Sequence, residues 1–429
     1  MSMTDWTELD QKHLWHPYTQ MKTAPPPIPV ERGEGVYLVT PDGRRILDGI
    51  SSWWVNIHGH SHPRLNQALA DQAGRLEHVI FAGFTHEPAS RLAAGLVEKA
   101  PGDMPWVFFS DDGSTAVEVA MKMAYQGWKQ RGEPQRRLFV ALDDAYHGDT
   151  FGTMAAGGSG VFHHMFQDLF FEVRRVRTPS SEGREDAGED LTELLQREGD
   201  RVAAVLVEPM LQGAAGMRIH SAEYLRSIRD ETRARGIPLI ADEIFTGFGR
   251  TGRFFACEHA GVEPDLLCVS KALTGGYLPL SATLATDAIY RDFYSDDRSK
   301  TFFHGHSYTA NTLACAVGLE SLRLFEDTEC LQRVAELEGL FQERLDRLDR
   351  FARVEDRRVL GPMAAFDVAP DGAGGYLDDL GPRMQRAFLE RDVLLRPLGN
   401  VVYFLPPYVI TDDECHRVFD LIEEVLASL

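Results

Sequence analysis

The sequence has few cysteines, no long apolar run and fewer basic than acidic residues. Only five of its 429 residues are cysteine, and no two of them form a C-x-x-C pair. An odd, scattered set argues against a disulfide framework and a zinc knuckle, and favours a reducing compartment. No apolar run approaches the roughly 20 residues that span a bilayer, and the N-terminus lacks the basic start and apolar core of a secretory signal. We therefore expect a cytosolic protein.

The charge balance excludes further classes of partner. Lys and Arg number 44 against 65 Asp and Glu, which gives a formal net charge of −21. So acidic a protein repels phosphate backbones and anionic lipids, and no basic patch interrupts the pattern. Nucleic acid and membranes are thus not expected as partners. The length exceeds what one hydrophobic core usually fills and leaves room to bury a cofactor.

Short apolar segments alternate with helical spacing in the middle of the chain. They cover residues 106–109, 138–141, 202–207, 237–241 and 265–270. Strands without polar alternation are typical of sheets covered on both faces. Residues 222–235, between Ser221 as N-cap and Gly236, have the length of a crossover helix. This pattern predicts an α/β fold with a mostly parallel, doubly wound sheet.

The two ends of the chain differ from this middle part. Up to residue 62 the sequence reads as short strands with tight turns, whereas beyond 310 it reads as long helices with a late strand at 401–405. We predict that residues 63–310 form a large cofactor-binding domain. Residues 1–62 and 311–429 are expected to form a second, smaller α+β domain.

Two charged residues follow directly on apolar strands. Asp242 comes after the strand at 237–241 and Lys271 after the strand at 265–270, so both should lie at the carboxyl edge of the sheet, where such folds bind ligands. Either residue alone could be a helix cap or a solvated side chain, but Lys271 has no charged neighbour between 266 and 286. A lysine in apolar surroundings loses proton affinity, as Schiff-base formation requires, and an aspartate can pair with a pyridine nitrogen. The pair therefore indicates pyridoxal phosphate.

A phosphate site is expected at the start of a nearby helix. Gly113 and Ser114 follow the strand at 106–109 and open a segment with helical spacing, which places backbone amides at a helix N-terminus. Ser307 could be a second phosphate donor. Tyr146 could stack on the flat cofactor ring, although core packing is an equally good explanation for an aromatic residue there.

Two other patterns suggest different chemistry. Residues 247–252 fit the dinucleotide fingerprint G-x-G-x-x-G, but the following residues do not read as the required helix. His58, His60 and His62, with His304 and His306, could suggest a metal site. Their alternate spacing on a short turn points the first three in different directions, and no acids or cysteines complete a ligand set. We expect neither a dinucleotide nor a metal.

Several longer segments resemble a known family. They include Ala-Asp-Glu-Ile-Phe-Thr-Gly-Phe-Gly-Arg-Thr-Gly at 241–252 and Gly-His-Ser-Tyr-Thr-Ala-Asn at 305–311. These segments resemble class III pyridoxal phosphate aminotransferases of fold type I, and the similarity covers nearly the whole chain. His-Pro-Tyr at 16–18, Ser-Ser-Trp-Trp at 51–54 and Pro-Pro-Tyr at 406–408 are similar to the members that act in biotin synthesis.

The resemblance implies a role for each matching residue. Lys271 would form the Schiff base and move the proton between substrate and cofactor, and Asp242 would keep the pyridine nitrogen protonated. The phosphate would be bound by four residues: Gly113 and Ser114, with His306 and Ser307 of the partner subunit in a homodimer. The substrate pocket would be lined by Tyr18, Trp53, Tyr146 and Gly305. Arg396 would hold the far carboxylate of the acceptor.

The same resemblance implies the substrates. An aminotransferase of biotin synthesis would take the amino group of S-adenosyl-L-methionine, leave it on the cofactor and then transfer it to 8-amino-7-oxononanoate. His306 and Ser307 stand where members that use adenosylmethionine often carry Pro and Thr, and some relatives with His-Ser use lysine. Lysine as the donor, or another class III omega-aminotransferase activity, therefore remains an alternative.

Overall fold

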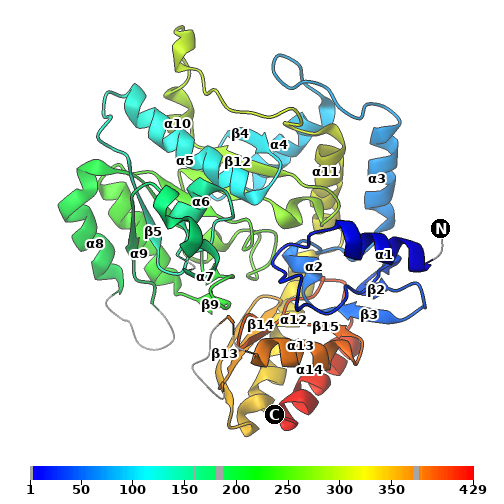
Figure 1. Ribbon diagram of the computed structural model, residues 1–429. Helices are drawn as coiled ribbons and strands as arrows, with labels where there is room; N and C mark the ends of the chain where they lie inside the picture. The colour runs from blue at the N-terminus through cyan, green and yellow to red at the C-terminus, as the bar shows by residue number, and fades with distance from the viewer. Residues whose placement is uncertain (1–2, 159, 180–186, 371–375, 378) are drawn as a thin grey trace.

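A seven-stranded sheet lies at the centre of the larger part of the computed structural model, which describes residues 3–158, 160–179, 187–370, 376–377 and 379–429 (Figure 1). The strand order is β4-β12-β11-β10-β7-β5-β6. Their bounds are β4 (Trp106–Ser110), β5 (Leu138–Leu142), β6 (Val173–Val176), β7 (Val202–Val207), β10 (Leu239–Asp242), β11 (Leu266–Val269) and β12 (Ser281–Ala285). Only β12 runs antiparallel to its neighbours within this sheet. All five predicted strands are present, and the predicted fold class is confirmed.

The central strands are buried on both faces because their side chains alternate between two hydrophobic clusters. In β5, Phe139 and Ala141 pack with helix α5 (Gly113–Gln130). Leu138, Val140 and Leu142 face the opposite cluster. With apolar residues needed on both sides, such a strand shows no polar alternation. This explains why these strands could be recognised from the sequence.

Helices cover both faces of this sheet (Figure 1). Besides α5 they are α3 (Pro63–Ala73), α4 (Glu87–Lys99), α6 (Phe151–Ala156), α7 (Gly160–His163), α8 (Ala187–Glu198), α9 (Ala222–Ala234), α10 (Asp287–Arg291) and α11 (Thr312–Asp327). The predicted crossover helix is α9. Its N-cap Ser221 accepts a hydrogen bond from Tyr224 N, and Gly236 follows its end with φ of 63°.

The smaller part of the molecule is built from both ends of the chain. It contains a three-stranded antiparallel sheet, β13-β14-β16, and a four-stranded sheet, β1-β2-β3-β15. The strands are β1 (Arg32–Glu34), β2 (Tyr37–Val39), β3 (Arg45–Asp48), β13 (Val354–Leu360), β14 (Met363–Val368), β15 (Val393–Leu394) and β16 (Val401–Phe404). Its C-terminal helices are α12 (Cys330–Asp346), α13 (Leu380–Leu389) and α14 (Asp412–Ala427).

One parallel strand pair joins the two ends of the chain. Leu47 of β3 lies opposite Val393 of β15. Leu47 also belongs to the hydrophobic cluster that holds Phe341 and Phe419, and Figure 1 shows the N-terminal strands beside the C-terminal helices. Helix α11, by contrast, packs against α3 and α4. The predicted domain limits at residues 62 and 310 stay a prediction.

The remaining elements are short. They are α1 (Met3–His13), α2 (Ser51–Trp54), β8 (Leu211–Gln212), β9 (Arg218–Ile219), η1 (His164–Leu169), η2 (Gly199–Arg201), η3 (Ala256–His259), η4 (Lys271–Thr274), η5 (Arg298–Lys300) and η6 (Arg347–Arg350). Helix η4 begins at the predicted Schiff-base lysine, and α2 holds the Ser-Ser-Trp-Trp segment.

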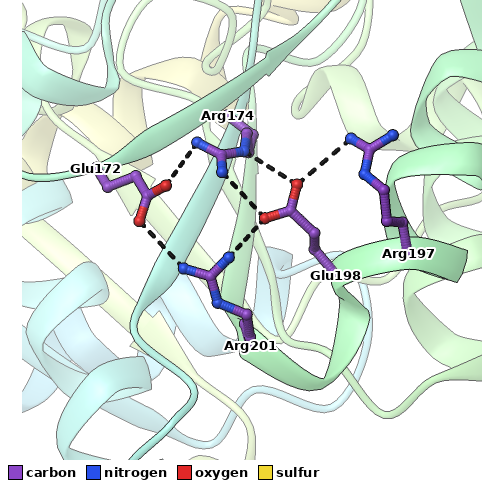
Figure 2. A network of polar contacts seen from close by, with 5 residues as sticks. All are labelled: Glu172, Arg174, Arg197, Glu198 and Arg201. Atoms are coloured by element: carbon purple, nitrogen blue, oxygen red, sulfur yellow. Dashed lines mark hydrogen bonds and ion pairs between the residues drawn. The ribbon is translucent and has the colours of Figure 1, made fainter.

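An ion-pair network secures the edge strand β6 (Figure 2). Its members are Glu172, Arg174, Arg197, Glu198 and Arg201. Glu198, at the end of α8, forms ion pairs with Arg174 of β6 and with Arg201. The distances from Glu198 Oε2 to the guanidinium nitrogens are 3.0 Å and 2.7 Å. Arginines at the edge of a sheet discourage pairing with a further strand.

Within the described part of the chain, no helix is long and apolar enough to cross a membrane. The five cysteines are buried and form no disulfide. Among the same residues, no group of three or more His, Cys, Asp or Glu side chains is arranged to hold a metal ion.

Candidate active site

A cavity of about 260 Å³ opens at the carboxyl ends of the central strands. Five predicted site residues line it: Gly113, Ser114, Tyr146, Asp242 and Lys271. Asp242 lies at the end of β10, and Lys271 follows β11, which pairs with β10 in parallel. The edge of a parallel sheet has therefore brought together residues that are far apart in the sequence.

Lys271 lies against aromatic rings in this cavity. Its Nζ is 4.7 Å from the centre of the Trp54 ring and 5.4 Å from that of Phe245. Burial lowers the pKa of Lys271 to about 8, although the nearby charges of Asp242 and Glu208 act to raise it. The residue has φ of 44°, in the left-handed region that non-glycine residues rarely adopt. With this pKa about a tenth of the amine is neutral, and therefore nucleophilic, at pH 7, far more than at the ordinary value of 10.5.

Asp242 is buried and held by two hydrogen bonds. Its Oδ2 lies 2.8 Å from His147 Nδ1, and its Oδ1 accepts from Ile244 N at 3.1 Å. Burial alone would lower the pKa of His147, but the hydrogen bond and charge of Asp242, with the charge of Glu208, raise it. His147 and Ile244 N therefore hold the Asp242 carboxyl group in a fixed orientation.

The start of α5 forms a cradle suited to an anion. Asp112 caps this helix through Thr115, which leaves Gly113 and Ser114 in the first turn, where amides have no partner within the helix. Gly148 packs directly on this turn: a Cβ at that position would lie 1.9 Å from Ser114 Oγ. Its φ of 127° also disfavours any other residue. The tight, positively polarised turn fits a phosphate group.

A second cavity of about 310 Å³ adjoins the first, since Trp54, Tyr146 and Lys271 line both. Tyr18 and Trp53 also line this outer cavity, with ring centres 5.3 Å apart in an edge-on contact. The Tyr18 hydroxyl donates to Asp149 Oδ2 at 2.5 Å and lies 3.2 Å from the hydroxyl of Tyr146. Burial is the main reason why the pKa of Tyr18 is raised to about 12. The outer cavity is therefore an aromatic pocket with polar hydroxyls in its wall.

The two tryptophans reach the cavities through an unusual turn. Residues 51–54 all have positive φ, between 51° and 75° at three positions and 45° at Ser52. Asp48 holds the turn: it accepts from Ser52 N at 2.9 Å and from Ser52 Oγ at 2.7 Å. Arg396 lies beside it, with its guanidinium carbon 4.4 Å from the centre of the Trp53 ring. Arg396 thus contacts the wall of the outer cavity through Trp53, but it is not among the described residues that line the cavity itself.

Three predicted site residues lie on the segment before α11. Gly305, His306 and Ser307 do not line either cavity within the described part of this chain. His306 Nε2 lies 3.7 Å from Asp111 Oδ1, next to the start of α5. The expectation that this segment acts in the site of a partner subunit stays a prediction.

Comparison with known proteins identifies the family. The family model for class-III aminotransferases matches residues 18–426. The chain belongs to the class-III aminotransferase family. The family uses pyridoxal phosphate, so the predicted enzyme class and cofactor are confirmed.

Individual members of the family resemble the chain along almost its whole length. The adenosylmethionine-8-amino-7-oxononanoate aminotransferase of Synechococcus elongatus is 48% identical, and the alignment covers 97% of this chain and 99% of that protein. The enzyme of the same name from Geobacter sulfurreducens is 40% identical over 100% of this chain and 98% of its own length. The crystal structure of the enzyme of that name from Methanocaldococcus jannaschii has a TM-score of 0.95 at 35% identity, covering 100% of this chain and 99% of that one.

Some residues of this class-III site were missed in the sequence. Glu208 lines the inner cavity and accepts from Tyr146 N at 3.1 Å. It directly follows the apolar strand β7, which is the same signal that singled out Asp242. His147 and Asp149 lie inside the Tyr-His-Gly-Asp-Thr segment at 146–150, where only Tyr146 was considered. Phe162 lines the outer cavity, but nothing in its local sequence distinguishes it from a core residue.

The two other patterns have structural explanations. His58 bonds to Ser321 Oγ at 2.9 Å, His60 to Asp48 at 2.9 Å, and His62 caps α3, so the three histidines serve different partners. After the glycine-rich segment at 247–252 the next element is the short helix η3, not the long helix that a dinucleotide site needs. The contacts of His58, His60 and His62 agree with the expectation that these histidines make loop hydrogen bonds. The short helix η3 agrees with the expectation that residues 247–252 are not a dinucleotide site.

Proposed function

We propose that this chain transfers the amino group of S-adenosyl-L-methionine to 8-amino-7-oxononanoate in biotin synthesis, with pyridoxal phosphate as cofactor. The observation that carries the proposal is that Lys271 lines both the inner cavity and the aromatic outer cavity. One amine thus faces a cofactor site on one side and a substrate site on the other. The names of the relatives, at 48% and 40% identity, support the same reaction.

The inner cavity offers a partner for each part of the cofactor. We assign the phosphate to Gly113 and Ser114, the ring nitrogen to Asp242 and the aldehyde to Lys271, with Tyr146 beside the ring. Pyridoxal phosphate, when bound, supplies the carbonyl that accepts an amino group and a ring that withdraws electrons from the substrate carbon.

The chain itself supplies orientation and proton transfer. Asp242, held by His147, presents a fixed carboxylate toward the ring nitrogen. Lys271 Nζ can accept or release a proton near neutral pH, because burial brings its pKa to about 8. The rings of Trp54 and Phe245 lie against that amine.

The outer cavity would take the two substrates in turn. Arg396 can form a bidentate pair with the far carboxylate of the acceptor, since a guanidinium matches that geometry. Tyr18, Trp53 and Tyr146 would contact the body of either substrate, with Gly305 completing the pocket. Two unlike substrates can share such a wall because aromatic rings contribute contact area without strict directionality.

We further propose that the catalytic unit is a homodimer in the cytosol. His306 and Ser307 of the partner subunit would complete the phosphate site. Phe303 and Tyr308, which flank this segment, are exposed large aromatics, which supports an interface there. Under this proposal residues 63–310 form the large domain and both chain ends form the small one.

The donor is tested by adding one amine at a time to the yellow holoenzyme and following the loss of its absorbance. Adenosylmethionine should bleach it, and 8-amino-7-oxononanoate should restore the colour. Bleaching by lysine alone would favour the alternative that the His306-Ser307 pair suggests, and bleaching only by simple amines would indicate an omega-aminotransferase. A protein that binds the cofactor but reacts with none of these donors would overturn the proposal.

A further inference from the structure

The short helix α7 brings two neighbouring side chains to opposite sides of the pocket wall. Phe162 lines the outer cavity, with its ring centre 5.7 Å from that of Tyr18. His163 is buried behind the wall, and its ring stacks on Tyr146 with centres 6.0 Å apart and an interplanar angle of 21°. His163 has no role in the function proposed above.

The polar atoms of His163 are unusual for a buried histidine. Neither ring nitrogen has a hydrogen-bond partner among the described residues. A buried polar atom without a partner costs free energy, so such a group calls for an explanation. A carboxylate lies close by: Oδ1 of Asp149 is 3.9 Å from His163 Nε2.

The backbone is shaped to hold this ring. A Cβ on Gly157 would lie 2.7 Å from Cε1 and 3.0 Å from Nδ1 of His163. Gly157 has φ of −70°, which any residue could adopt, so its backbone conformation does not require glycine. Glycine is favoured here because a side chain would occupy the space of the His163 ring. The imidazole is thus fixed on one side by Gly157 and on the other by Tyr146.

Asp149 connects His163 to the substrate pocket. Its Oδ2 accepts the hydrogen bond from the Tyr18 hydroxyl, whereas its Oδ1 faces His163. Burial tends to raise the pKa of Asp149, but His163, Tyr18 and Tyr146 together lower it, which keeps the carboxylate ionised. Because one carboxyl group has two oxygens in a fixed relation, whatever orients Oδ1 also orients Oδ2 toward Tyr18.

We infer that His163 is a positioning residue: it orients Asp149, and through it the Tyr18 hydroxyl, for binding of the amino donor. This inference rests on the proposed function for the identity of the donor. The contacts from which we argue it are independent of that function. The replacement of His163 should therefore alter donor binding more than the chemical step.

The test compares three variants of the holoenzyme in the donor half-reaction. His163→Phe fills the space without a ring nitrogen and should raise the half-saturation concentration of adenosylmethionine about fivefold, with little change in the maximal rate. His163→Asn keeps a polar group and should recover part of that loss. His164→Phe, at the exposed neighbouring position, is the matched control and should behave like the unaltered protein.

A double-mutant cycle tests whether His163 acts through Asp149. If it does, His163→Phe combined with Asp149→Asn should be no worse than Asp149→Asn alone, because the two changes remove one shared interaction. The inference would be overturned if the effects of the two single changes on the half-saturation concentration multiplied in the double variant, or if only the maximal rate fell.

A readout independent of activity separates this inference from the proposed function. Labelling tyrosine at Cζ for carbon NMR, with Tyr18→Phe to assign the signal, reports the hydrogen bond of the Tyr18 hydroxyl. His163→Phe should move that signal in the same direction as Asp149→Asn does. An unmoved signal would overturn the inference; a moved signal in a protein that converts no donor would instead contradict the proposed function alone.

Discussion

His147 Nδ1 lies 2.8 Å from Oδ2 of Asp242, and both side chains are buried. The two residues come from different parts of the sheet edge, so their contact depends on the fold and not on the local sequence. A buried carboxylate that loses its partner carries the cost of its own desolvation.

The first prediction concerns this pair. His147→Phe should lower the rate of the donor half-reaction by about one to two orders of magnitude, because loss of a hydrogen bond to a buried charge costs about 1.5–3 kcal/mol. Single-turnover spectroscopy of the cofactor measures the rate, and cofactor titration measures any loss of affinity. His147→Asn, which can still donate, should retain more activity. Equal rates for the Phe variant and the unaltered protein would show that Asp242 does not need this partner.

The second prediction concerns the pH dependence of Lys271. Only the neutral amine attacks an aldehyde, and burial lowers the pKa of Lys271 from 10.5 to about 8. Capture of pyridoxal phosphate by cofactor-free protein, trapped with borohydride, should therefore rise with pH with a midpoint near 8 and level off above about pH 9. Lys271→Ala should abolish the rapid labelling. A midpoint near 10.5, the value of an exposed lysine, would contradict the placement of this amine among aromatic rings.

Much of the large sheet was predictable because its strands are buried on both faces. Strands β5 and β7 are apolar throughout, so their sequences alone mark them. Strand β6 reads Val-Arg-Arg-Val, as suits an edge where arginines meet acids, and it was missed. Strand β12, Ser281–Ala285, was also missed. Its antiparallel direction could not have been predicted either, because tertiary packing sets strand direction and leaves no local signal in the sequence.

The site was predictable where a charged residue ends an apolar strand. Asp242 and Lys271 share that signal, and Glu208 has it too, although only the structure directed attention to it. The left-handed turn at 51–54 could not be inferred, because Ser and Trp seldom adopt positive φ and contacts from Asp48 hold them there. The role of Arg396 came only from family resemblance, since its neighbour Trp53 is far away in sequence.

The third prediction concerns Glu208, which is buried in the inner cavity. Burial raises its pKa from 4.5 to about 7. Between these values the folded protein binds more protons than the unfolded chain does, so this group lowers stability as the pH rises through that window. Glu208→Gln imitates the protonated acid and can still accept from Tyr146 N. The variant should match the unaltered protein near pH 4.5 and be more stable by about 3 kcal/mol above pH 7.

Denaturant unfolding of the cofactor-free proteins across this pH range measures the difference. Glu223→Gln, at an exposed position on α9, is the matched control and should show no such trend. A constant offset between Glu208→Gln and the unaltered protein at every pH would mean that Glu208 remains ionised in the folded state.

The fourth prediction concerns Arg396, which contacts Trp53 in the wall of the outer cavity. If its guanidinium holds the far carboxylate of 8-amino-7-oxononanoate, Arg396→Ala removes a charge-assisted pair worth about 2–3 kcal/mol. The half-saturation concentration of the acceptor should then rise about 30- to 150-fold. The donor half-reaction should remain largely intact if, as proposed, Arg396 recognises the acceptor alone. Single-turnover measurement of each half-reaction separates the two effects.

Arg396→Lys distinguishes charge from shape at this position. A lysine keeps the positive charge but lacks the planar fork that pairs with both oxygens of a carboxylate, so the acceptor should bind with intermediate strength. It also loses the flat contact with the Trp53 ring, which lies 4.4 Å from the guanidinium carbon. If Ala and Lys damage both half-reactions equally, the arginine holds the Trp53 turn in place and does not recognise the carboxylate. A loss confined to the acceptor would instead assign this end of the pocket to that substrate.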